Sequence, residues 1–499
     1  MILLESPTVI RLIGYESRKP ELIKRLTYKD EKVDWAYRKL QNNHWLRNKI
    51  GNLAFNEKLQ ELKSQVEKCL LFEDEKGLWT YSGLRGIFEK EYGDKVVRQY
   101  DLPEPKLIPW ANVPVHESRY YQVDSQKALI KGSELGPASV EIGTGLGKSK
   151  ICMNIIKHFG LQTVVMVPSV SIAGQMYSDL VHHFGKGKVG MYGGGKKEFN
   201  KLITVSIGAS LTRLDPDDTA YKKLSQAKVF ILDESHLSPA QTLAKVCFGL
   251  MAGVPLRYFL SGTQLRSDGL GLLLEGIIGP ICYSMTVQEG VDQGFLAKPT
   301  FRMCWINSNI TDKNGNVFYN IDAQKMNKAH LFYNKELNIK AAELANKSVA
   351  LMSRPVVILI DELEQLSYLL PHLRYEFRFA HGGVTADNKG TIPVEYHKSD
   401  PQELVKEFNQ GKFPILIGTS CIGIGTDLKP IQTLINLRGG KSEVEISQNI
   451  GRGTRLSPGK TDFLYIDFGF RNVPMLEKHA KERIKIFRQV YPNVSEVNL

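Results

Sequence analysis

Two short segments of the sequence carry the residue types needed to bind and hydrolyse a nucleotide. The first holds glycines at positions 143, 145 and 147, followed by Lys148 and Ser149. Glycines let the backbone fold tightly around a polyphosphate with its N–H groups pointing inward. Lys148 would place a positive charge on the β- and γ-phosphates, and Ser149 would offer its hydroxyl to Mg²⁺. For a glycine-rich segment taken alone, the alternative is an ordinary turn.

The second segment is the acidic sequence Asp233-Glu234-Ser235-His236. We expect Asp233 to hold Mg²⁺ through water and Glu234 to polarise the attacking water. The alternative is that two acids simply begin a surface loop. That alternative does not explain why they follow an apolar run and a phosphate-binding loop in the order that a nucleotidase needs. The two segments together therefore predict nucleotide hydrolysis.

Short apolar runs must position these residues. Residues 228–232, Lys-Val-Phe-Ile-Leu, are typical of a strand buried in a parallel sheet. This places Asp233 and Glu234 at the carboxyl end of a strand, where open α/β sheets have their sites. Residues 150–158 are expected to form a helix whose N-terminus adds its dipole to the phosphate site. Similar runs predict further strands at 164–168, 257–260, 354–360 and 413–417, with a helix at 361–370.

The composition indicates a soluble protein with a polyanionic partner. A chain of 499 residues suits two to four domains, and its 42% hydrophobic content is ordinary for globular proteins. The net charge of +12 suits nucleic acid, although a basic surface without a partner is the alternative. No apolar run reaches the roughly 18 residues of a membrane span. The first six residues are too short and acidic for a signal peptide. We therefore expect a cytoplasmic protein, or one of the host cytoplasm if its source is a virus.

The six cysteines are scattered at positions 69, 152, 247, 282, 304 and 421, without a C-x-x-C pair. This spacing disfavours a zinc site, an iron–sulfur site and a disulfide framework. We expect buried thiols in a reducing compartment.

The two segments resemble motifs of the superfamily 2 helicases. Residues 144–149 match T-G-x-G-K-[ST], although the strict phosphate-loop pattern would place glycine where Ile142 stands, and residues 233–236 match D-E-x-H. Further segments follow in the order of that family. They are R-x-Y-Q at 119–122, S-G-T at 261–263, T-x-x-x-x-x-G-x-D at 419–427 and Q-x-x-G-R-x-x-R at 448–455. The resemblance covers roughly residues 111–475.

The resemblance implies a role for each of these residues toward ATP and Mg²⁺. Gln122 would select adenine, and Arg119 would contact the nucleotide as well. Thr144, Gly145, Gly147, Lys148 and Ser149 would cradle the phosphates, while Gly425 and Asp427 would face the nucleotide. Arg455 and then Arg452, in one motif with Gln448, would neutralise the γ-phosphate. These arginines at i and i+3 would share one face of a helical turn, and arginine binds phosphate oxygens bidentately.

Other residues of the resemblance would connect hydrolysis to a nucleic acid. Pro168, Gln175, Ser210 and Thr419 are implied contacts to its phosphates. His236 would pass the state of the nucleotide to the bound strand through Ser261 and Thr263. The glycine-rich segment 193–197, with its two lysines, is either another such contact or a solvated turn.

The implied fold class is α/β, with two RecA-like parallel-sheet lobes in tandem and ATP between them. We expect a small α/β (or α+β) N-terminal domain at 1–105, the first lobe at 106–300 and the second lobe at 301–499. Within the first domain, residues 19–49 are basic and aromatic, 54–71 suggest an amphipathic helix, and 78–92 suggest a strand and a helix. Two interpretations of this domain stay open: a nucleic-acid-binding module, or a small core with a solvated basic face.

The layout resembles the UvsW-type helicases of tailed phages. This resemblance implies an ATP-dependent helicase that moves 3′ to 5′ on forked or branched DNA in replication, repair and recombination. Fork unwinding, branch migration and dissociation of D-loops or R-loops are the implied reactions. A duplex-DNA translocase or an RNA helicase of the same superfamily is the alternative. An alternative of another class is a junction-binding or annealing protein with a vestigial ATPase, and a nuclease subunit ranks lowest. Protein partners are not indicated.

One segment past the lobe junction suggests a strand-separating element. Asn314-Gly315-Asn316 is typical of a hairpin turn. We hypothesise that residues 312–318 form a pin that separates strands.

Overall fold

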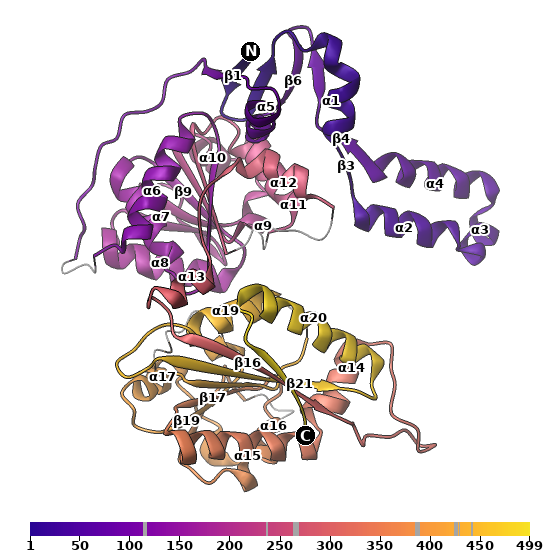
Figure 1. Cartoon of the computed structure of the whole chain (residues 1–499), viewed down its shortest axis with the longest axis vertical. Helices are drawn as coiled ribbons and strands as arrows, with labels where there is room; N and C mark the ends of the chain where they lie inside the picture. The colour runs from indigo at the N-terminus through magenta and orange to yellow at the C-terminus, as the bar shows by residue number, and fades with distance from the viewer. Residues whose placement is uncertain are drawn as a thin grey trace. The chain divides into compact units, whose positions relative to one another are not determined.

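The computed structural model describes residues 1–499 except for 113–116, 236–237, 263–268, 385–389, 424–427, 429 and 441–442. The chain forms two compact units. One comprises Met1–Ile142 with Gly147–Ser284, and the other comprises Gly143–Leu146 with Met285–Leu499. Each unit contains a largely parallel sheet covered by helices, which confirms the predicted α/β class with two RecA-like lobes (Figure 1).

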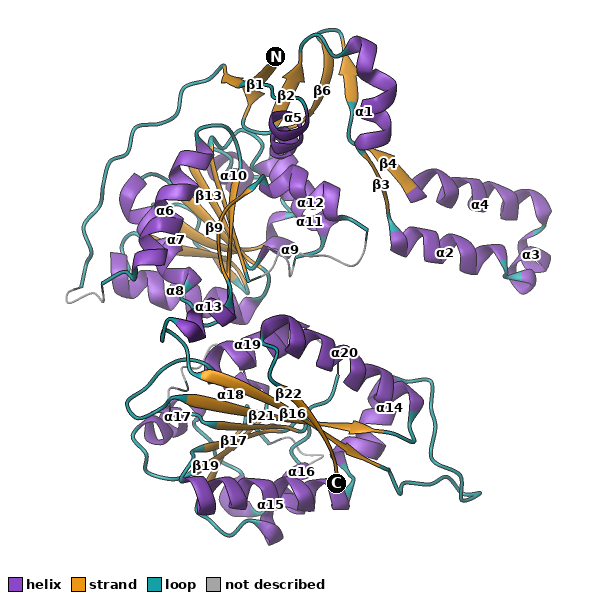
Figure 2. Ribbon diagram, viewed as in Figure 1, coloured by secondary structure: helices purple, strands orange, loops and turns teal. Residues whose placement is uncertain are grey.

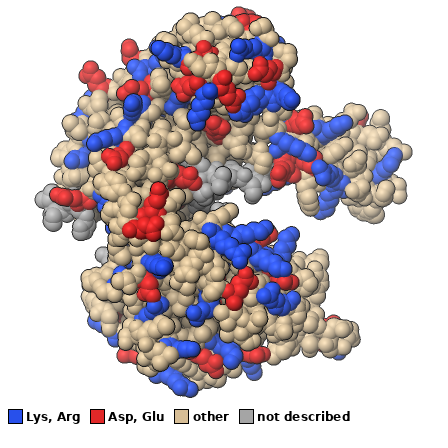
Figure 3. Space-filling model, viewed as in Figure 1, with Lys and Arg blue, Asp and Glu red and all other residues tan. Residues whose placement is uncertain are grey.

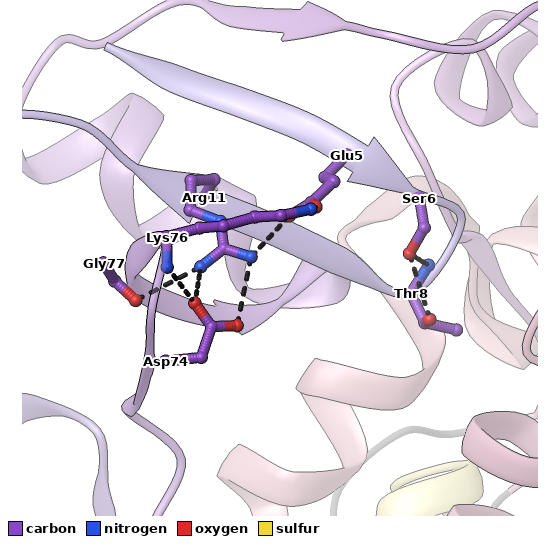
Figure 4. Close-up of polar contacts among 7 residues, drawn as sticks. All are labelled: Glu5, Ser6, Thr8, Arg11, Asp74, Lys76 and Gly77. Atoms are coloured by element: carbon purple, nitrogen blue, oxygen red, sulfur yellow. Dashed lines mark hydrogen bonds and ion pairs between the residues drawn. The ribbon is translucent and has the colours of Figure 1, made fainter.

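The chain begins with a five-stranded sheet of order β5-β6-β2-β1-β7. Its strands are β1 (Ile2–Ser6), β2 (Val9–Leu12), β5 (Phe72–Asp74), β6 (Gly77–Tyr81) and β7 (Val96–Arg98). The guanidinium of Arg11 ties three of them together by donating to Glu5, to Asp74 and, at 3.2 Å, to the carbonyl of Gly77 (Figure 4). Arg11 lowers the pKa of the Asp74 carboxyl through this hydrogen bond.

This N-terminal sheet shares one hydrophobic core with the first lobe. The core joins residues such as Leu4 and Phe88 to Phe230 and Leu274. The rings of Tyr81 and Phe248 stack at 3.7 Å. The buried Arg85, in α5 (Arg85–Glu91), donates to the carbonyl oxygens of Pro137 and Gly132. The predicted domain boundary at residue 105 therefore stays a prediction. The N-terminal sheet and the first lobe pack into one compact unit.

A helical arm leaves this sheet through the ribbon of β3 (Thr27–Lys29) and β4 (Glu67–Cys69). It consists of α2 (Glu31–Gln41), α3 (His44–Ile50) and α4 (Asn52–Val66), and Figure 2 shows it projecting from the first unit. Asp30 and Asn43 cap α2 and α3 by accepting backbone N–H groups. The helix predicted at 54–71 ends at Val66 because the next residues pair as β4.

The first lobe has a sheet of order β11-β10-β12-β9-β13-β14-β8-β15, in which β10, β12, β9, β13, β14 and β8 run parallel. Helices α6, α7 and α8 cover one face of it, and α11 and α12 cover the other (Figure 2). The strands are β8 (Ala138–Ile142), β9 (Thr163–Val167), β10 (Val189–Gly193), β11 (Lys196–Lys197), β12 (Ile203–Ile207), β13 (Val229–Asp233), β14 (Leu256–Ser261) and β15 (Ile281–Met285). The helices are α6 (Tyr120–Ser133), α7 (Lys148–Phe159), α8 (Val170–Phe184), α9 (Gly208–Leu211), α10 (Thr219–Leu224), α11 (Ala240–Lys245) and α12 (Gly271–Ile278).

The second lobe has a parallel sheet of order β18-β19-β17-β20-β21-β16-β22. Helices α15 and α16 cover one face, and α19 and α20 cover the other (Figure 2). The strands are β16 (Lys298–Ile306), β17 (Val356–Leu359), β18 (Phe377–Ala380), β19 (Ile415–Gly418), β20 (Thr433–Asn436), β21 (Asp462–Phe470) and β22 (Val494–Asn498). The helices include α13 (Val287–Asp292), α14 (Ala323–Asn327), α15 (Lys335–Met352), α16 (Gln365–Leu369), α17 (Pro401–Asn409), α19 (Glu443–Gly453) and α20 (Pro474–Val490). The helix predicted at 361–370 is thus shorter.

Three smaller expectations can be compared with the structure. All six cysteines are free thiols, but only Cys152, Cys247 and Cys304 are buried and the others are half-buried. Asn314 to Asn316 do form a tight turn, closed by a bridge between Thr311 and Val317. None of the described helices is both long and apolar enough to cross a membrane.

Candidate nucleotide and nucleic-acid sites

The phosphate loop leads directly from the end of β8 into α7. Gly147 caps α7 with a left-handed backbone, φ +81°, and a Cβ atom there would lie 2.7 Å from Nε2 of Gln122. The backbone conformation therefore favours glycine, and any larger residue would also displace the Gln122 amide. Lys148 and Ser149 follow as the first residues of the helix, whose buried Ile151 and Ile155 hold it against the sheet. The free N–H groups of this first turn and the helix dipole favour an anion.

Asp233 and Glu234 stand at the carboxyl end of β13, as predicted. Asp233 is buried, and its carboxylate accepts the backbone N–H of Glu234 at 3.0 Å. Glu234 has a φ of 55°, an uncommon backbone conformation for a residue with a side chain. Its carboxylate forms an ion pair with Lys148, at 3.0 Å between Oε1 and Nζ. Loop and acidic segment therefore meet within the first lobe.

The protonation of Asp233 reflects its surroundings. Burial, assisted by the negative charge of Glu234, raises the pKa of the Asp233 carboxyl to about 7, and Lys148 partly opposes that shift. Desolvation and the second acid both disfavour the charged carboxylate, whereas a cation that binds beside it favours the charged form.

These residues fit the predicted ATP and Mg²⁺. Mg²⁺ usually keeps several waters and takes one or two carboxylates together with substrate phosphates. Asp233 and the Ser149 hydroxyl are such a small donor set beside an anion-binding helix end. Among the described residues no group of three or more acidic, histidine or cysteine side chains offers a complete cage for a metal.

Gln122 is attached to the phosphate loop. Its Oε1 accepts the backbone N–H of Arg119 at 3.0 Å, at the start of α6. Its Nε2 approaches the carbonyl oxygen of Gly147 at 3.5 Å. Arg119 in turn donates to the hydroxyl of Tyr121 at 3.0 Å. The structure therefore places both residues of the predicted adenine site beside the loop, and their roles toward adenine stay predictions.

Of the three predicted coupling residues, the structure describes only Ser261. Ser261 is fully buried at the end of β14, the strand that lies between β13 and β8 in the sheet. It is therefore between the acidic segment and the phosphate loop. His236 and Thr263 lie outside the described residues. The coupling role stays a prediction.

Two of the predicted nucleic-acid contacts, Pro168 and Ser210, follow neighbouring parallel strands of the first sheet. Pro168 follows β9, Ser210 lies in α9 directly after β12, and Gln175 is half-buried in α8. Because the neighbouring strands are parallel, their carboxyl ends meet at one edge of the sheet. A Cβ atom on Gly193, at the end of β10, would lie 2.7 Å from Oγ of Ser210.

The segment 193–197 is a tight hairpin. Lys196 and Lys197 form β11 and pair with β10, so Gly194 and Gly195 turn with φ values of +60° and +86°. Two positive φ angles are typical of a two-residue hairpin. Nζ of Lys196 lies 4.7 Å from the ring centre of Tyr177 in α8. The hairpin brings an exposed lysine to the same edge as Ser210.

In the second lobe, the predicted arginine motif is only partly helical. Gln448 and the buried Arg452 lie in α19, which ends at Gly453. A side chain on Gly453 would meet the ring of Phe463 at 2.0 Å. Thr454 then caps the helix by donating to the carbonyl oxygens of Ile450 and Gly451.

Arg455 lies two residues beyond the end of α19, so a turn and not the α-helix itself joins it to Arg452. Its N–H still donates to the carbonyl oxygen of Arg452 at 3.2 Å, which keeps one turn between them. Arg455 is half-exposed, whereas Arg452 is 8% exposed.

Thr419 follows β19, and its N–H donates to the carbonyl oxygen of Ala380 at 3.2 Å. It is half-buried at the carboxyl end of the second sheet. Gly425 and Asp427 lie outside the described residues. Their contacts with the nucleotide stay predictions.

Sequence reasoning missed a buried ion pair behind this motif. Arg483 in α20 donates to both oxygens of Asp467 in β21, at 2.9 and 3.1 Å, and to the carbonyl oxygen of Gly440 at 2.6 Å. It therefore fixes the segment just before α19. The sequence did carry a signal for this buried arginine: Arg483 shares one helix face with the apolar residues Ala480, Ile484 and Phe487.

Two family models match the chain. One, described as Type III restriction enzyme, res subunit, matches residues 116–262, and one described as Helicase conserved C-terminal domain matches residues 343–457. They cover the phosphate loop with the acidic segment and the arginine motif, respectively.

Individual relatives are distant but long. A protein of Sulfolobus islandicus filamentous virus that is named as a helicase is 21% identical over 87% of this chain and 81% of its own length. The DNA 3′-5′ translocase XPB2 of Sulfurisphaera tokodaii is 21% identical over 67% of this chain and 78% of its own length.

The chain resembles solved structures of nucleic-acid enzymes, and one of these matches supports the shared fold. The ATP-dependent Type ISP restriction-modification enzyme LlaBIII bound to DNA matches 82% of this chain and 34% of its own, with a TM-score of 0.53 and 11% identity. The structure of T4 UvsW matches 100% of this chain and 99% of its own at 16% identity. Its TM-score is 0.42, so this match does not identify a shared substrate.

Proposed function

The chain is an ATP-hydrolysing helicase of superfamily 2, and from this premise we propose that it is a DNA motor that acts on forks and junctions. The main support is the first-lobe site, where Lys148 meets Glu234 beside the buried Asp233. The DNA part is supported by the relative named as a DNA translocase and by the absence of the D-E-A-D form of the acidic segment. The order and layout of the motifs resemble those of UvsW-type helicases, and this resemblance implies branched DNA as the substrate.

We infer that ATP binding rearranges the ion pair of the first lobe. In the structure, Lys148 forms an ion pair with Glu234; phosphates bound at the Gly147–Ser149 turn would attract Lys148 away from that pair. Glu234 is then released to polarise water. Magnesium would supply charge neutralisation at the phosphates, and Ser149 and Asp233 are the residues that would hold it. Catalysis of this kind depends on positioning and electrostatics.

The arginine motif is proposed to complete the charge neutralisation. Arg455 is the first choice because it is less buried than Arg452 and therefore more accessible to a phosphate. Gln448 would orient groups beside it. Thr144, Gly145, Gly425 and Asp427 are proposed to line the nucleotide, with Arg119 and Gln122 toward the base.

The edge of the first sheet is proposed to bind the DNA backbone. Pro168 and Ser210 lie there together with the Lys196 hairpin, and Gln175 of α8 and Thr419 of the second lobe would contribute further contacts. Ser261, at the end of the strand between both nucleotide segments, would pass the state of the nucleotide to this edge together with His236 and Thr263. Residues 1–105 are proposed to add nucleic-acid affinity.

The experiment that tests this proposal compares substrates side by side. ATP-dependent unwinding is measured on forks, Holliday junctions and duplexes with 3′ or 5′ tails, and ATPase stimulation is measured with DNA and with RNA. We expect forks and junctions to be unwound, DNA to stimulate more than RNA, and 3′ tails to be preferred. Stronger stimulation by RNA would favour an RNA helicase, and stimulation by blunt duplex without unwinding would favour a duplex translocase.

Glu234→Gln separates a motor from an annealing protein with a vestigial ATPase. We expect the variant to bind ATP while turnover falls about 10²- to 10⁴-fold, because a water-polarising base is lost. Unwinding should disappear with turnover. Unwinding that survives in Glu234→Gln would rule out the motor.

The turn at 311–317 is proposed as a strand-separating pin. Asp312 stabilises it by accepting the N–H groups of Asn314 and Asn316 at 2.8 and 3.0 Å, and Tyr319 and Ile321 beside it are exposed. Deletion of 312–318 should reduce junction unwinding and spare DNA-stimulated ATPase. Unchanged unwinding would contradict this role.

A further inference from the structure

The helical arm, residues 30–66, carries two exposed tryptophans that the hydrolysis site does not explain. Trp35 lies in α2 and Trp45 in α3, and 63% and 68% of their surfaces are exposed. Tryptophan is highly buried on average in folded proteins. Two such rings in solvent on one small element indicate a surface that another molecule covers.

Both tryptophans belong to the same local arrangement. Nζ of Lys39 lies 4.9 Å from the ring centre of Trp35, and Nζ of Lys49 lies 4.8 Å from that of Trp45. Each lysine stands four residues after its tryptophan, so ring and cation share one helix face. Each pair therefore offers an aromatic surface next to a positive charge. These are the two groups with which proteins hold single-stranded nucleic acid, the ring for a base and the cation for its phosphate.

The charges of the arm are complementary to a polyanion around these rings. Residues 35–56 contain Arg38, Lys39, Arg47 and Lys49 but no aspartate or glutamate. The acids of the arm stand at 30, 31 and 34, next to the ribbon, and at 57 and 61 in α4. Figure 3 shows red side chains where the arm leaves the first unit and blue side chains further out (Figure 3).

The arm is a defined element attached to the first lobe. Leu40, Phe55 and Val66 are the buried apolar residues of the arm, and none of them belongs to the main hydrophobic cluster of the unit. At the base, a Cβ atom on Gly269 would lie 2.2 Å from the carbonyl oxygen of Lys29. Gly269 follows β14 in the chain, so the base of the arm contacts the lobe that contains Lys148 and Glu234.

We propose that the arm is a second nucleic-acid site, which binds an unpaired strand. Trp35 and Trp45 stack on its bases, and Lys39, Arg47 and Lys49 neutralise its phosphates. The proposal rests on the proposed function in one respect, because a helicase supplies the unpaired strand. The arm contains none of the helicase motifs and would hold a strand that has been separated.

The test compares binding of the full-length protein to a fluorescent oligothymidylate of about 20 nucleotides, long enough for such a site. ATP is omitted. Trp35→Ala/Trp45→Ala should weaken binding by at least about fivefold for each ring removed. Trp35→Phe/Trp45→Phe should retain most of the affinity, because phenylalanine still stacks. In the parent, the oligonucleotide should quench tryptophan fluorescence, and this quenching should largely disappear in the phenylalanine variant.

Leu53→Ala is the matched control, because Leu53 is 78% exposed on the same arm and has no ring. It should bind like the parent. Far-ultraviolet circular dichroism and thermal melting verify that each variant is folded. The proposal is overturned if the double alanine variant binds within twofold of the parent, or if Leu53→Ala weakens binding as much. An equal loss of affinity for a blunt duplex would assign the arm to duplex backbone and overturn base stacking.

The outcome is separable from that of the proposed function. Binding to the oligonucleotide is measured without hydrolysis, so it decides the role of the arm even if forks are not unwound. Basal ATPase without nucleic acid should be unchanged in the tryptophan variants, because the arm contains none of the nucleotide residues. A loss of basal turnover together with binding would contradict a site confined to the arm.

Discussion

The hydrolysis site of the first lobe and the helical arm use side chains in opposite ways. Lys148 and Asp233 are 7% and 5% exposed; Asp233 ends the fully buried β13, and Lys148 begins the largely buried α7. Trp35 and Trp45 stand in solvent on an element with only three buried apolar residues. Phosphate chemistry needs fixed charges out of water, whereas stacking needs a ring that a base can reach. The hydrolysis site therefore depends on charges held rigidly in the protein interior, and the arm depends on rings held accessible at the surface.

This contrast also determines what a substitution does. In the lobe, a changed charge alters both the chemistry and a buried ion pair. On the arm, a changed ring alters affinity with little effect on folding, because exposed positions contribute little to stability. The following predictions test this separation, beginning with the largest effect.

Arg455→Ala should reduce ATP turnover about 10³-fold or more, because an arginine that neutralises the transferred phosphate accelerates hydrolysis by about that factor. Steady-state ATPase with saturating DNA measures it. Oligothymidylate affinity without ATP should stay within twofold of the parent. Arg378→Ala is the control, since Arg378 is an exposed arginine of the same lobe paired with Glu376. Similar activity of both variants would remove Arg455 from the site.

Arg483→Met should destabilise the protein by about 3–5 kcal/mol, because Asp467 would stay buried without its cation. Denaturant unfolding followed by circular dichroism measures the change. Arg38→Ala removes an ion pair with Asp34 on the arm, where the arginine side chain is 67% exposed, and should cost about 1 kcal/mol or less. Equal costs would contradict the difference between lobe and arm.

Phe55→Ala should unfold the arm while the lobes stay folded. The loss of a buried phenylalanine costs about 3–5 kcal/mol, and the arm has only two other buried apolar residues, Leu40 and Val66. Hydrogen exchange should show fast exchange in α2 and α4, with unchanged protection in β13. Exchange that rises equally throughout the first unit would mean that the arm does not open separately.

Lys460→Met should stabilise the second lobe slightly, and more so at low pH. Burial, assisted by the charge of Arg455, lowers the pKa of Lys460 to about 7, below that of an unfolded lysine. The unfolded state therefore binds more protons between about pH 7 and pH 10.5, and the parent gains stability as pH rises through this range. Thermal melting at pH 6.5 and pH 9.5 should show a larger gain for the variant at pH 6.5. An equal gain would contradict a buried, proton-losing lysine.

Much of the nucleotide site could be predicted from the sequence because its geometry is local. Asp233 follows directly from an apolar strand, and Gly147 directly precedes the helix that it caps, so chain order alone places them. The parallel sheet then brings the carboxyl ends of β8, β13 and β14 to one edge. The strand predictions were correct to within a few residues for the same reason.

The remainder depended on contacts between distant parts of the chain. Arg483 and Asp467 belong to a helix and a strand whose packing no local pattern specifies. The end of α19 depends on Phe463, which fills the space beside Gly453. On the arm, the aromatic and basic composition was visible, but only the helices show that Trp35 and Trp45 are exposed beside Lys39 and Lys49. The Lys148–Glu234 ion pair likewise required the folded lobe.

The most direct test of the account compares Glu234→Gln with Trp35→Ala/Trp45→Ala in the same two assays, ATP turnover and oligothymidylate affinity. We predict that the glutamine variant loses turnover and keeps its affinity for the oligonucleotide. The tryptophan variant should keep basal turnover and lose affinity. If both variants lose both properties together, hydrolysis and strand binding are not carried by separate regions and the account is wrong.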